Sequence, residues 1–347
     1  QGRDKLLDYI DEHLAKREPV NAVKNIMKNR EFEELDVPAY SERTRASLKI
    51  QEGCNNFCTF CIIPWSRGLM RSRKPENVLK QARQLVSAGY KEIVLTGIHT
   101  GGYGEDFADY KLSDLLWDLN KVEGLRRIRI SSIEASQIDE NVLEVLNQSA
   151  KMCRHLHIPI QAGDNTVLKR MRRKYTVEEY RDKIVKIREA LPNLAITTDV
   201  IVGFPGETDD MFENTYRLIE ELGFAELHVF PYSMRTGTPA SRMTDQVDEQ
   251  VKNERVQRLI ALSENLSLQY AKQFEKEVLE VIPEQPYKDA PDSGLYEGHS
   301  DNYLKLVFPA NETLVGKLCK VRLDEPGTEY CKGTFVRELD SIGDAVS

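Results

Sequence analysis

Three cysteines lie within eight residues of one another in this 347-residue chain, at positions 54, 58 and 61. They follow the apolar, strand-like run at 47–50, so all three lie on one short loop. Such a loop can wrap one face of a cubic iron–sulfur cluster, in which thiolate sulfur is the ligand that iron prefers. The spacing therefore predicts one [4Fe-4S] cluster bound by Cys54, Cys58 and Cys61.

The sequence has no fourth cysteine near this group, so one iron of the predicted cluster would be open to a ligand other than protein. Zinc is an alternative, but structural zinc sites usually combine two C-x-x-C-like pairs, and no second pair is present. A loop whose cysteines bind nothing is the other alternative. Cys153, Cys319 and Cys331 are isolated in the sequence, and we expect them to fill space in a core or at the surface.

The composition is that of an ordinary soluble protein, with 30% charged residues, 40% apolar residues and a net charge of −8. The length allows two domains. No apolar run reaches membrane-spanning length, and the N-terminus has no signal-peptide pattern. Cysteines without a disulfide framework indicate the reducing cytoplasm. Because the chain does not begin with Met, we expect a fragment or a processed chain.

From residue 47 the pattern alternates between short apolar strands and amphipathic helices. The expected strands are 47–51, 92–96, 127–131, 155–159, 196–202 and 227–230. The expected helices are 75–88, 113–122, 139–148, 166–171, 177–190 and 209–222. Six such units predict an α/β fold with a parallel sheet and right-handed crossovers, in which the chemistry gathers at the carboxyl ends of the strands.

Polar or glycine-rich segments follow several of these strands. The loop at 96–104 either binds a ligand through its backbone or is simply flexible. Glu134 follows the third strand, where it binds a ligand amine or caps a helix. Arg235 follows the sixth strand and is either a substrate contact or a surface cation. His155 and His157 share one face of the fourth strand; without a third ligand nearby, we expect core or hydrogen-bonding histidines rather than a metal site.

Two basic runs lie at 67–74 and 169–174. Each is either a solvated face or a contact for nucleic acid. The first run contains Arg67, Arg71 and Arg73 and directly follows the cysteine loop, so these three arginines are candidates for substrate binding.

The two ends of the chain have different patterns. Residues 1–40 predict a helix and a connector, and residues 248–276 predict a long helix. Beyond it, five short segments punctuated by glycine predict strands: 277–282, 294–300, 303–308, 317–323 and 332–337. Five antiparallel strands of this length form a small closed β-barrel of a size that often binds nucleic acid.

The motif C-x3-C-x2-C with an aromatic residue, here Phe60, before the last cysteine resembles the signature of the radical S-adenosylmethionine (SAM) enzymes. The resemblance implies a partial (β/α)6 barrel with the cluster loop after its first strand. It also implies that the open iron binds the amino and carboxylate groups of SAM. An electron from the cluster then cleaves SAM to a 5′-deoxyadenosyl radical.

The same resemblance assigns Phe60, Glu134 and further residues to the SAM site. Thr96 and Gly97 are expected near the SAM amino group, Gln161 near the ribose, and Gly203 near the adenine. The stretch containing Gly203 lacks the first glycine of the family pattern. No side chain is assigned a catalytic role.

The order of radical SAM barrel, long helix and small β-barrel resembles the methylthiotransferase family, whose C-terminal domain is called TRAM. The stretches at 50–64, 155–161 and 199–207 resemble the branch that acts on tRNA threonylcarbamoyladenosine. The resemblance implies a transferase that converts N6-threonylcarbamoyladenosine at position 37 of tRNA to its 2-methylthio form. Alternatives are a related enzyme acting on another RNA base or a ribosomal protein, and a non-catalytic iron–sulfur protein that binds RNA.

The family pattern also predicts the domain organisation. Residues 1–40 would be a helical remnant of a missing N-terminal domain, 41–275 a radical SAM domain, and 276–340 a TRAM-like β-barrel. That N-terminal domain carries a second, auxiliary [4Fe-4S] cluster, the site of sulfur delivery, which we expect only in a full-length protein. The implied partners are tRNA and an electron donor such as a flavodoxin or ferredoxin, in the cytoplasm and without a membrane.

Overall fold

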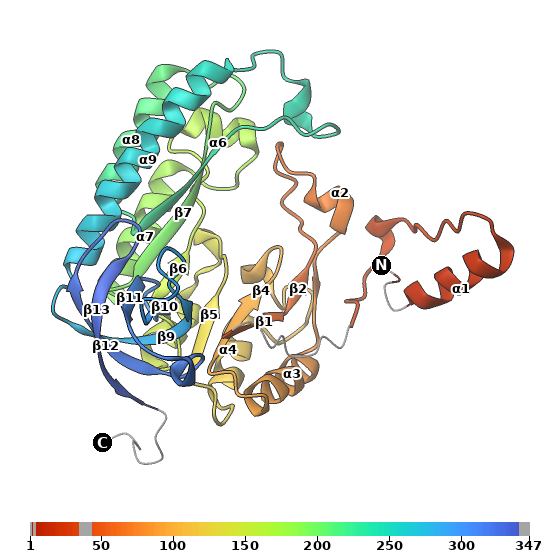
Figure 1. Cartoon of the computed structure of the whole chain (residues 1–347). Helices are drawn as coiled ribbons and strands as arrows, with labels where there is room; N and C mark the ends of the chain where they lie inside the picture. Colours follow the sequence, from red (N-terminus) through yellow and green to blue (C-terminus); the bar gives the residue numbers. More distant parts are fainter. Residues whose placement is uncertain (1, 3–4, 35–43, 340–347) are drawn as a thin grey trace.

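The computed structural model describes residues 2, 5–34 and 44–339, and its centre is a curved sheet of six parallel strands (Figure 1). The strands are β1 (Arg45–Lys49), β4 (Glu92–Thr96), β5 (Arg127–Ile130), β6 (His155–His157), β7 (Ala195–Val202) and β8 (Glu226–Pro231). Hydrogen bonds join them in the orders β1-β4-β5 and β6-β7-β8, and an isolated bridge between Ile128 and Met152 connects the two halves. The predicted parallel strands are confirmed.

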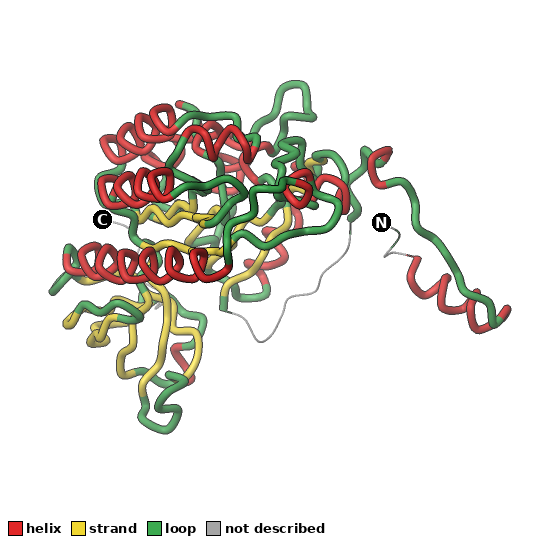
Figure 2. The backbone as a smooth tube through the Cα atoms, turned by 90° about the horizontal axis from the view of Figure 1, so that it is seen from above, coloured by secondary structure: helices red, strands yellow, loops and turns green. Residues whose placement is uncertain are grey.

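Helices cover the outer side of this curved sheet, as the view from above shows (Figure 2). They are α3 (Pro75–Ser87), α4 (Leu112–Asn120), α5 (Glu140–Gln148), α6 (Asn165–Met171), α7 (Val177–Ala190), α8 (Asp209–Leu222) and α9 (Glu249–Lys272). Capping residues set several of their starts: the side chains of Asp139, Thr176 and Thr208 accept hydrogen bonds from the first turns of α5, α7 and α8. The predicted helices are confirmed, and the fold is a partial (β/α)6 barrel.

Side chains alternate along the strands between the helices and the inside of the barrel. In β1, Ala46 and Leu48 are buried in the core, whereas Ser47 is exposed. In β8, Leu227 is buried, whereas Glu226 and His228 are exposed. Because alternate residues of a strand point to opposite faces, the apolar set packs on the helices and a more polar set lines the inside.

The last five strands close into a small barrel beside the α/β part. They are β9 (Val278–Pro286), β10 (Leu295–Ser300), β11 (Lys305–Pro309), β12 (Cys319–Glu325) and β13 (Cys331–Glu338), in the spatial order β10-β11-β13-β12-β9. The predicted five-stranded barrel is confirmed. The expectation that every pair is antiparallel is wrong for one pair, because β11 runs parallel to β13. Closing a five-stranded barrel requires at least one parallel neighbour, since strand directions cannot alternate around an odd number.

A buried ion-pair group fixes the small barrel to the α/β part. Glu92 of β4 accepts hydrogen bonds from Arg127 and Arg129 of β5, at 3.5 and 2.7 Å. Burial alone would raise the pKa of Glu92, but the two guanidinium groups lower it below its usual range. Arg127 also donates to the carbonyl of Glu280 at 2.6 Å, and Arg129 donates to the carbonyl of Ser300 at 3.1 Å. The ion-pair group of Glu92, Arg127 and Arg129 therefore connects β4 to β5 and connects both strands to the small barrel.

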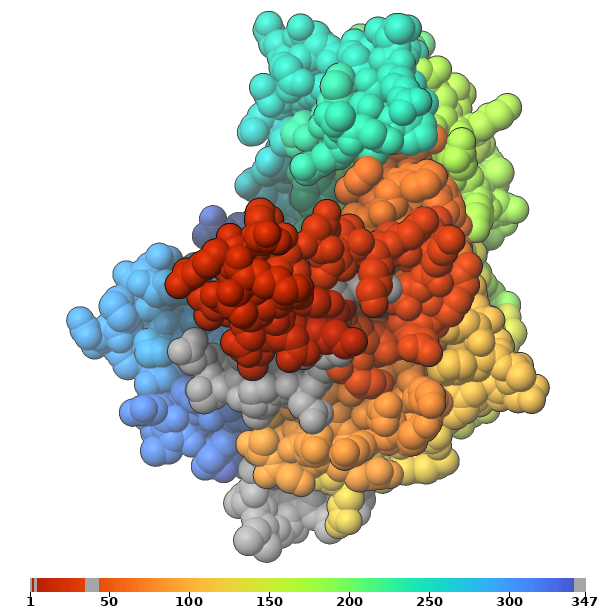
Figure 3. Space-filling view, turned by 90° about the vertical axis from the view of Figure 1, so that its right-hand side faces the viewer, coloured from red at the N-terminus to blue at the C-terminus, as the bar shows by residue number. Residues whose placement is uncertain are grey.

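The N-terminal residues form α1 (Leu6–Lys16) and the 3-10 turn η2 (Ile26–Lys28), as expected of a helix and connector. No residue of α1 is buried, and its apolar side chains are exposed. This segment lies in front of the residues that follow it in Figure 3. The part of the expectation that falls on 35–40 lies outside the described residues. No helix among residues 2, 5–34 and 44–339 is both long enough and apolar enough to cross a membrane.

The structure has short elements that the sequence did not predict. These are β2 (Gln51–Glu52), α2 (Ile63–Arg67), β3 (Arg71–Ser72), η3 (Thr100–Gly102), η4 (Ala135–Gln137), η5 (Pro239–Arg242) and η6 (Glu312–Leu314). Most of them lie in loops at the carboxyl ends of the barrel strands. They are too short to show a helical or strand periodicity.

Replacing Glu92 with Ala should lower the free energy of unfolding by about 3–5 kcal/mol, because it leaves two buried guanidinium groups without their carboxylate. Urea denaturation followed by circular dichroism measures this change. The matched control is Glu123→Ala, at an exposed position, which should change stability by less than about 0.5 kcal/mol. Equal effects of the two substitutions would show that the buried group does not stabilise the fold.

Candidate functional site

A two-stranded hairpin carries the cysteine loop. In this hairpin, β2 pairs with β3, with Gln51 opposite Ser72. The loop begins at Gly53, which has a φ of +74°, and a Cβ added there would lie 2.1 Å from the carbonyl oxygen of Leu69. Only glycine fits this turn. The N–H of Cys54 then donates to the carbonyl of Gly68 at 3.2 Å, which ties the start of the loop to its end.

Each of the three loop cysteines is a free thiol. Their sulfur atoms do not all lie within 4.8 Å of one another. A single zinc ion, at about 2.3 Å from each sulfur, would draw them to roughly 3.8 Å apart. The three sulfur atoms are therefore not arranged as they would be around a single zinc ion.

Burial controls the protonation of these thiols. It raises the pKa of Cys54 to about 11, opposed by a backbone hydrogen bond from Asn56 and reinforced by the charges of Cys58 and Glu134. Burial also raises the pKa of Cys61. Cys54 is therefore protonated at neutral pH in the metal-free protein, and metal binding must displace its proton.

Arg173 is the main positive group at the cysteine loop. Its Nη1 lies 3.3 Å from Sγ of Cys58, and its Nη2 lies 3.0 Å from Oε1 of Glu134. The same carboxylate oxygen accepts a hydrogen bond of 2.9 Å from the side chain of Asn56 in the loop. A fixed cation beside Cys58 offsets the negative charge that thiolates bring to a cluster. The sequence shows Arg173 only as part of a basic run, because nothing in it links this residue to a cysteine 115 residues away.

Gln51 connects the cysteine loop to the glycine-rich loop that follows β4. Its Oε1 accepts hydrogen bonds from the N–H groups of Ile98 and His99, at 3.0 and 2.8 Å. Its Nε2 donates to the carbonyl oxygens of Glu52 and Gly53. The loop at 96–104 is therefore held in place. The alternative that it is merely flexible does not describe it.

Two of the predicted SAM-site residues lie on this clamped loop. Thr96 is the last residue of β4, and its carbonyl accepts a hydrogen bond from the N–H of Ile50. A Cβ added at Gly97 would lie 3.1 Å from Oε1 of Gln51 and 3.1 Å from Oγ1 of Thr100. Glycine thus allows the close approach of the two loops.

The other predicted residues lie after β2, β5, β6 and β7. Glu134 occupies the N-cap position of η4, where its carbonyl accepts a hydrogen bond from the N–H of Gln137 but its side chain makes no capping hydrogen bond. The N–H of Gln161, whose φ is +66°, donates to the carbonyl of Asp199 at 2.9 Å. Gly203 has a φ of +68°, and a Cβ there would meet Cγ of Lys252 at 2.3 Å. Phe60 packs edge-on against Phe204. All of these residues lie at the carboxyl end of the sheet.

The structure separates the four arginines proposed to contact substrate. Arg71 is 2% exposed and donates to the carbonyls of Leu69 and Arg67. Arg73 is 6% exposed and pairs with Glu34 at 2.7 Å. Buried, paired guanidinium groups do not present a charge to phosphate, so the structure does not support this role for Arg71 and Arg73. Arg67 and Arg235 are exposed at the cysteine end.

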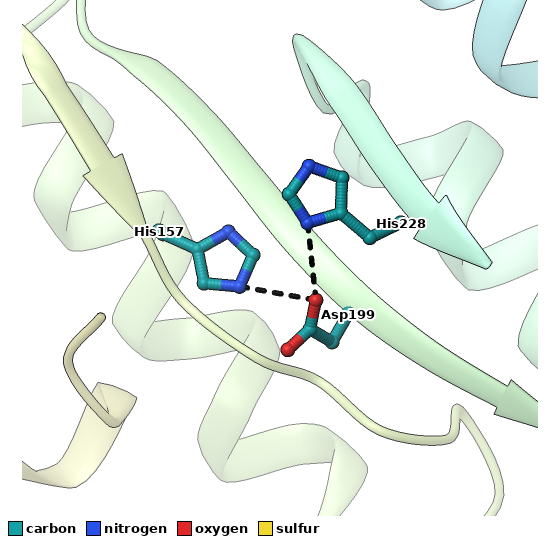
Figure 4. A group of neighbouring side chains, drawn as sticks. All are labelled: His157, Asp199 and His228. Carbon is teal, nitrogen blue, oxygen red and sulfur yellow. Dashed lines mark hydrogen bonds and ion pairs between the residues drawn. The ribbon is translucent and has the colours of Figure 1, made fainter. Parts of the chain in front are cut away.

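Lower in the barrel, His157 belongs to a cluster with Asp199 and His228 (Figure 4). Both Nε2 of His157 and Nδ1 of His228 lie 3.2 Å from Oδ1 of Asp199. Burial alone would raise the pKa of Asp199, but its hydrogen bonds from His157 and His228 lower it. The hydrogen bond between His228 and Asp199 also raises the pKa of His228. The predicted hydrogen-bonding role of His157 is confirmed. The expectation that no further metal-ligating side chain lies near it is wrong, because Asp199 and His228 each bring a ligand atom into a group whose atoms all lie within 4.8 Å of one another. The sequence missed its partners, since they come from β7 and β8.

Residues 48–219 match the model of the radical SAM superfamily. The chain is 63% identical over 341 residues to threonylcarbamoyladenosine tRNA methylthiotransferase MtaB of Bacillus subtilis. The alignment covers 98% of this chain and 76% of that protein. The chain is 43% identical to tRNA-2-methylthio-N(6)-dimethylallyladenosine synthase of Carboxydothermus hydrogenoformans, over 84% of this chain and 66% of that protein. The coproporphyrinogen III oxidase HemN of Escherichia coli aligns over 82% of this chain and 68% of that one, with 17% identity and a TM-score of 0.49.

The chain belongs to the radical SAM methylthiotransferase family, a family of transferases. The match to the superfamily begins in β1 and runs through the cysteine loop to α8. It therefore includes the loop at 96–104, Glu134, Gln161 and Gly203. The family resemblance that the cysteine spacing predicted is confirmed.

Anaerobic reconstitution with iron and sulfide should load about four iron atoms per chain. Cys54→Ala should abolish loading, because it removes one of three ligands on the loop. Cys331→Ala is the matched control: this buried cysteine lies in the small barrel, and its loss should leave the iron content unchanged. Iron analysis and the visible absorption spectrum measure the outcome. A full cluster in the Cys54, Cys58, Cys61 triple variant would falsify the ligand assignment.

Proposed function

We propose that this chain is the SAM-cleaving part of an enzyme that converts N6-threonylcarbamoyladenosine at position 37 of tRNA to its 2-methylthio form. The observation that carries the proposal is the 63% identity to a relative named for this substrate, over 98% of the chain. Relatives named for dimethylallyladenosine are less similar, at 43% identity or below. The chain spans 76% of the first relative and 66% of the second, so the activity is proposed for the whole protein.

The domain organisation proposed for this activity divides the chain in three. Residues 1–40 form a linker, 41–275 a radical SAM domain, and 276–340 a TRAM-like β-barrel. Strand pairing changes from parallel before α9 to largely antiparallel after it, which supports the boundary between residues 275 and 276.

The arrangement of the cysteine loop fits a [4Fe-4S] cluster with SAM on its open iron. Cys54, Cys58 and Cys61 would hold the cluster. The residues that would hold SAM are Phe60, Thr96, Gly97, Glu134, Gln161 and Gly203. When bound, this pair of cofactors supplies a carbon radical able to remove hydrogen from an unreactive C–H bond. The protein holds the cysteine loop through Arg173 and Gln51 and shields the reacting centre from water.

Sulfur delivery requires a second, auxiliary cluster in this proposal. The three remaining cysteines are buried in separate places: Cys153 in the α/β part, and Cys319 and Cys331 in the core of the small barrel. They do not form a second cysteine loop like that at 54–61. In this proposal the auxiliary cluster is not bound by these three cysteines.

The proposed partners are tRNA and a low-potential electron donor such as a flavodoxin or ferredoxin. The proposed location is the cytoplasm, which holds tRNA and keeps the six cysteines reduced.

Cluster-loaded protein supplied with SAM and dithionite should release 5′-deoxyadenosine without forming methylthiolated tRNA. The residues that would cleave SAM are all within the chain, whereas the sulfur donor is not. Liquid chromatography of the nucleosides measures both products. Cys58→Ala should release no 5′-deoxyadenosine, and Cys319→Ala should match the unchanged protein. Absence of 5′-deoxyadenosine from the loaded protein would contradict the proposed function.

Reversing the exposed arginines at the cysteine end, with Arg67→Glu and Arg235→Glu together, should weaken tRNA binding. Removing one cation from a phosphate lowers the slope of log affinity against log salt by about 0.7–0.9. Fluorescence anisotropy across a salt series measures this slope. The control is Arg83→Glu, at an exposed position of α3. If the double variant keeps both its affinity for tRNA and the slope of log affinity against log salt, the two arginines are solvent-exposed side chains that do not contact tRNA.

A further inference from the structure

The inside of the (β/α)6 barrel contains a cavity of about 630 Å³. It is lined by residues of all six barrel strands and of the small barrel: Thr44, Arg45, Ser47, Val94, Arg129, Ile130, Ser131, His155, His157, Thr197, Asp199, His228, Glu284, Gln285 and Tyr303. This volume is in the range of small-ligand sites, but most of the residues that line it carry polar side chains. None of the residues assigned to the cluster or to SAM lines it. The cavity therefore has no role in the function described so far.

Two layers of side chains lie one above the other inside the barrel. His157, Asp199 and His228 form the polar layer, and Phe230 belongs to an apolar layer. Asp199 is paired with His228, and Ile201 is paired with Phe230 two residues nearer the carboxyl end. Phe230 lies on the same face of β8 as His228 and is 50% exposed. Successive side chains on one face of a strand are about 6.6 Å apart. An apolar layer thus lies between the polar layer and the cysteine end.

Hydrogen-bond directions in the polar layer follow from Asp199. Its carboxylate can only accept, so His157 donates from Nε2 and His228 donates from Nδ1. The other nitrogen of His157 lies 2.9 Å from the hydroxyl of Thr197, which also contacts Nε2 of His155 at 3.1 Å. The network therefore runs through three strands and fixes both rings of the stacked pair His157 and His228.

His228 keeps one ring nitrogen, Nε2, for a ligand. Because Nδ1 donates to Asp199, Nε2 accepts when the ring is neutral and donates when the ring is protonated, a form that the nearby carboxylates of Asp199 and Glu226 favour. Its Nε2 is 4.0 Å from the carboxylate of Glu226, which is beyond hydrogen-bond distance, and its side chain is 45% exposed. The other cations of the cavity are engaged: Arg129 is bound to Glu92, and Arg45 is 3.3 Å from Glu284. His228 is thus the cation of the lining that is both held in place and accessible.

We propose that the cavity holds the polar N6 substituent of the substrate's modified adenosine, hydrogen-bonded to Nε2 of His228, while the base lies against Phe230 on the side of the cysteine end. The proposal rests on the proposed function and makes His228 a specificity-determining residue. A threonylcarbamoyl group offers carbonyl and carboxylate oxygens to this donor. A dimethylallyl group offers none and would leave Nε2 of His228 without a partner from the ligand, which a site built to hydrogen-bond its substrate disfavours.

The layer order also suits the reaction. The 2-position of the adenine must face the cysteine end, where SAM would bind, and the N6 substituent leaves the ring in a different direction. The loop after β8 returns to that end, since the N–H of Ala240 donates to the carbonyl of Thr59 at 2.9 Å. A base stacked on Phe230 therefore lies between the polar layer and the cluster loop, within reach of both.

The test compares three anticodon stem-loop RNAs that differ only at position 37: threonylcarbamoyladenosine, dimethylallyladenosine and adenosine. Fluorescence anisotropy gives the dissociation constant of each for the full chain. The unchanged protein should prefer the threonylcarbamoyl RNA, and His228→Phe should reduce that preference by about tenfold while leaving affinity for the adenosine RNA unchanged. His228→Gln, which keeps a donor, should retain most of the preference. Phe230→Ala should weaken all three RNAs by at least fivefold.

The matched control is His13→Phe, the same substitution at an exposed position of α1, which should change none of the constants. Thermal unfolding checks that each variant is folded. A preference that survives in folded His228→Phe overturns this subsite and leaves the proposed function intact. Failure of the unchanged protein to bind any of the three RNAs overturns the proposed function and the subsite with it.

Discussion

The position of Glu92 between Arg127 and Arg129 is the interaction on which the arrangement of the two barrels depends. A carboxylate this deeply buried is tolerated only with hydrogen-bonded cations, and here both cations come from the neighbouring strand. Each guanidinium also donates a hydrogen bond to a backbone carbonyl of the small barrel. Tyr303 completes the contact, because its ring lies over Arg129 and stacks on His155. These contacts attach the small barrel to the α/β part beside the cavity that Arg129, His155 and Tyr303 line.

The cysteine loop depends on several units of the larger barrel. Arg173, from the turn after α6, reaches Cys58, and Glu134, from the segment after β5, reaches the loop through Asn56. Thr59 is bonded at both backbone groups, to Met171 on one side and Ala240 on the other. A cluster held by three cysteines of one loop is therefore positioned by contacts from three separate parts of the chain.

Much of this structure could be predicted from the sequence. Alternating apolar patterns predicted the six parallel strands, their helices and the terminal barrel, because period and length are local properties. The cysteine spacing predicted the family. The roles of Arg71 and Arg173 could not be predicted, since both belong to basic runs that mix buried and exposed members, and only packing decides which guanidinium is buried. The cluster of His157, Asp199 and His228 was missed for the same reason: its three members meet only across strands.

The amide of Gln51 has a consequence for how the two loops at the cysteine end behave. It accepts two N–H groups from one loop and donates to two carbonyls of the other, so all of its hydrogen-bonding capacity is used. A carboxylate of the same shape would accept but not donate. The two loops are thus joined by a group that no other side chain of similar size can replace. A displacement caused by a ligand on the glycine-rich loop reaches the cysteines as a shift of one rigid piece.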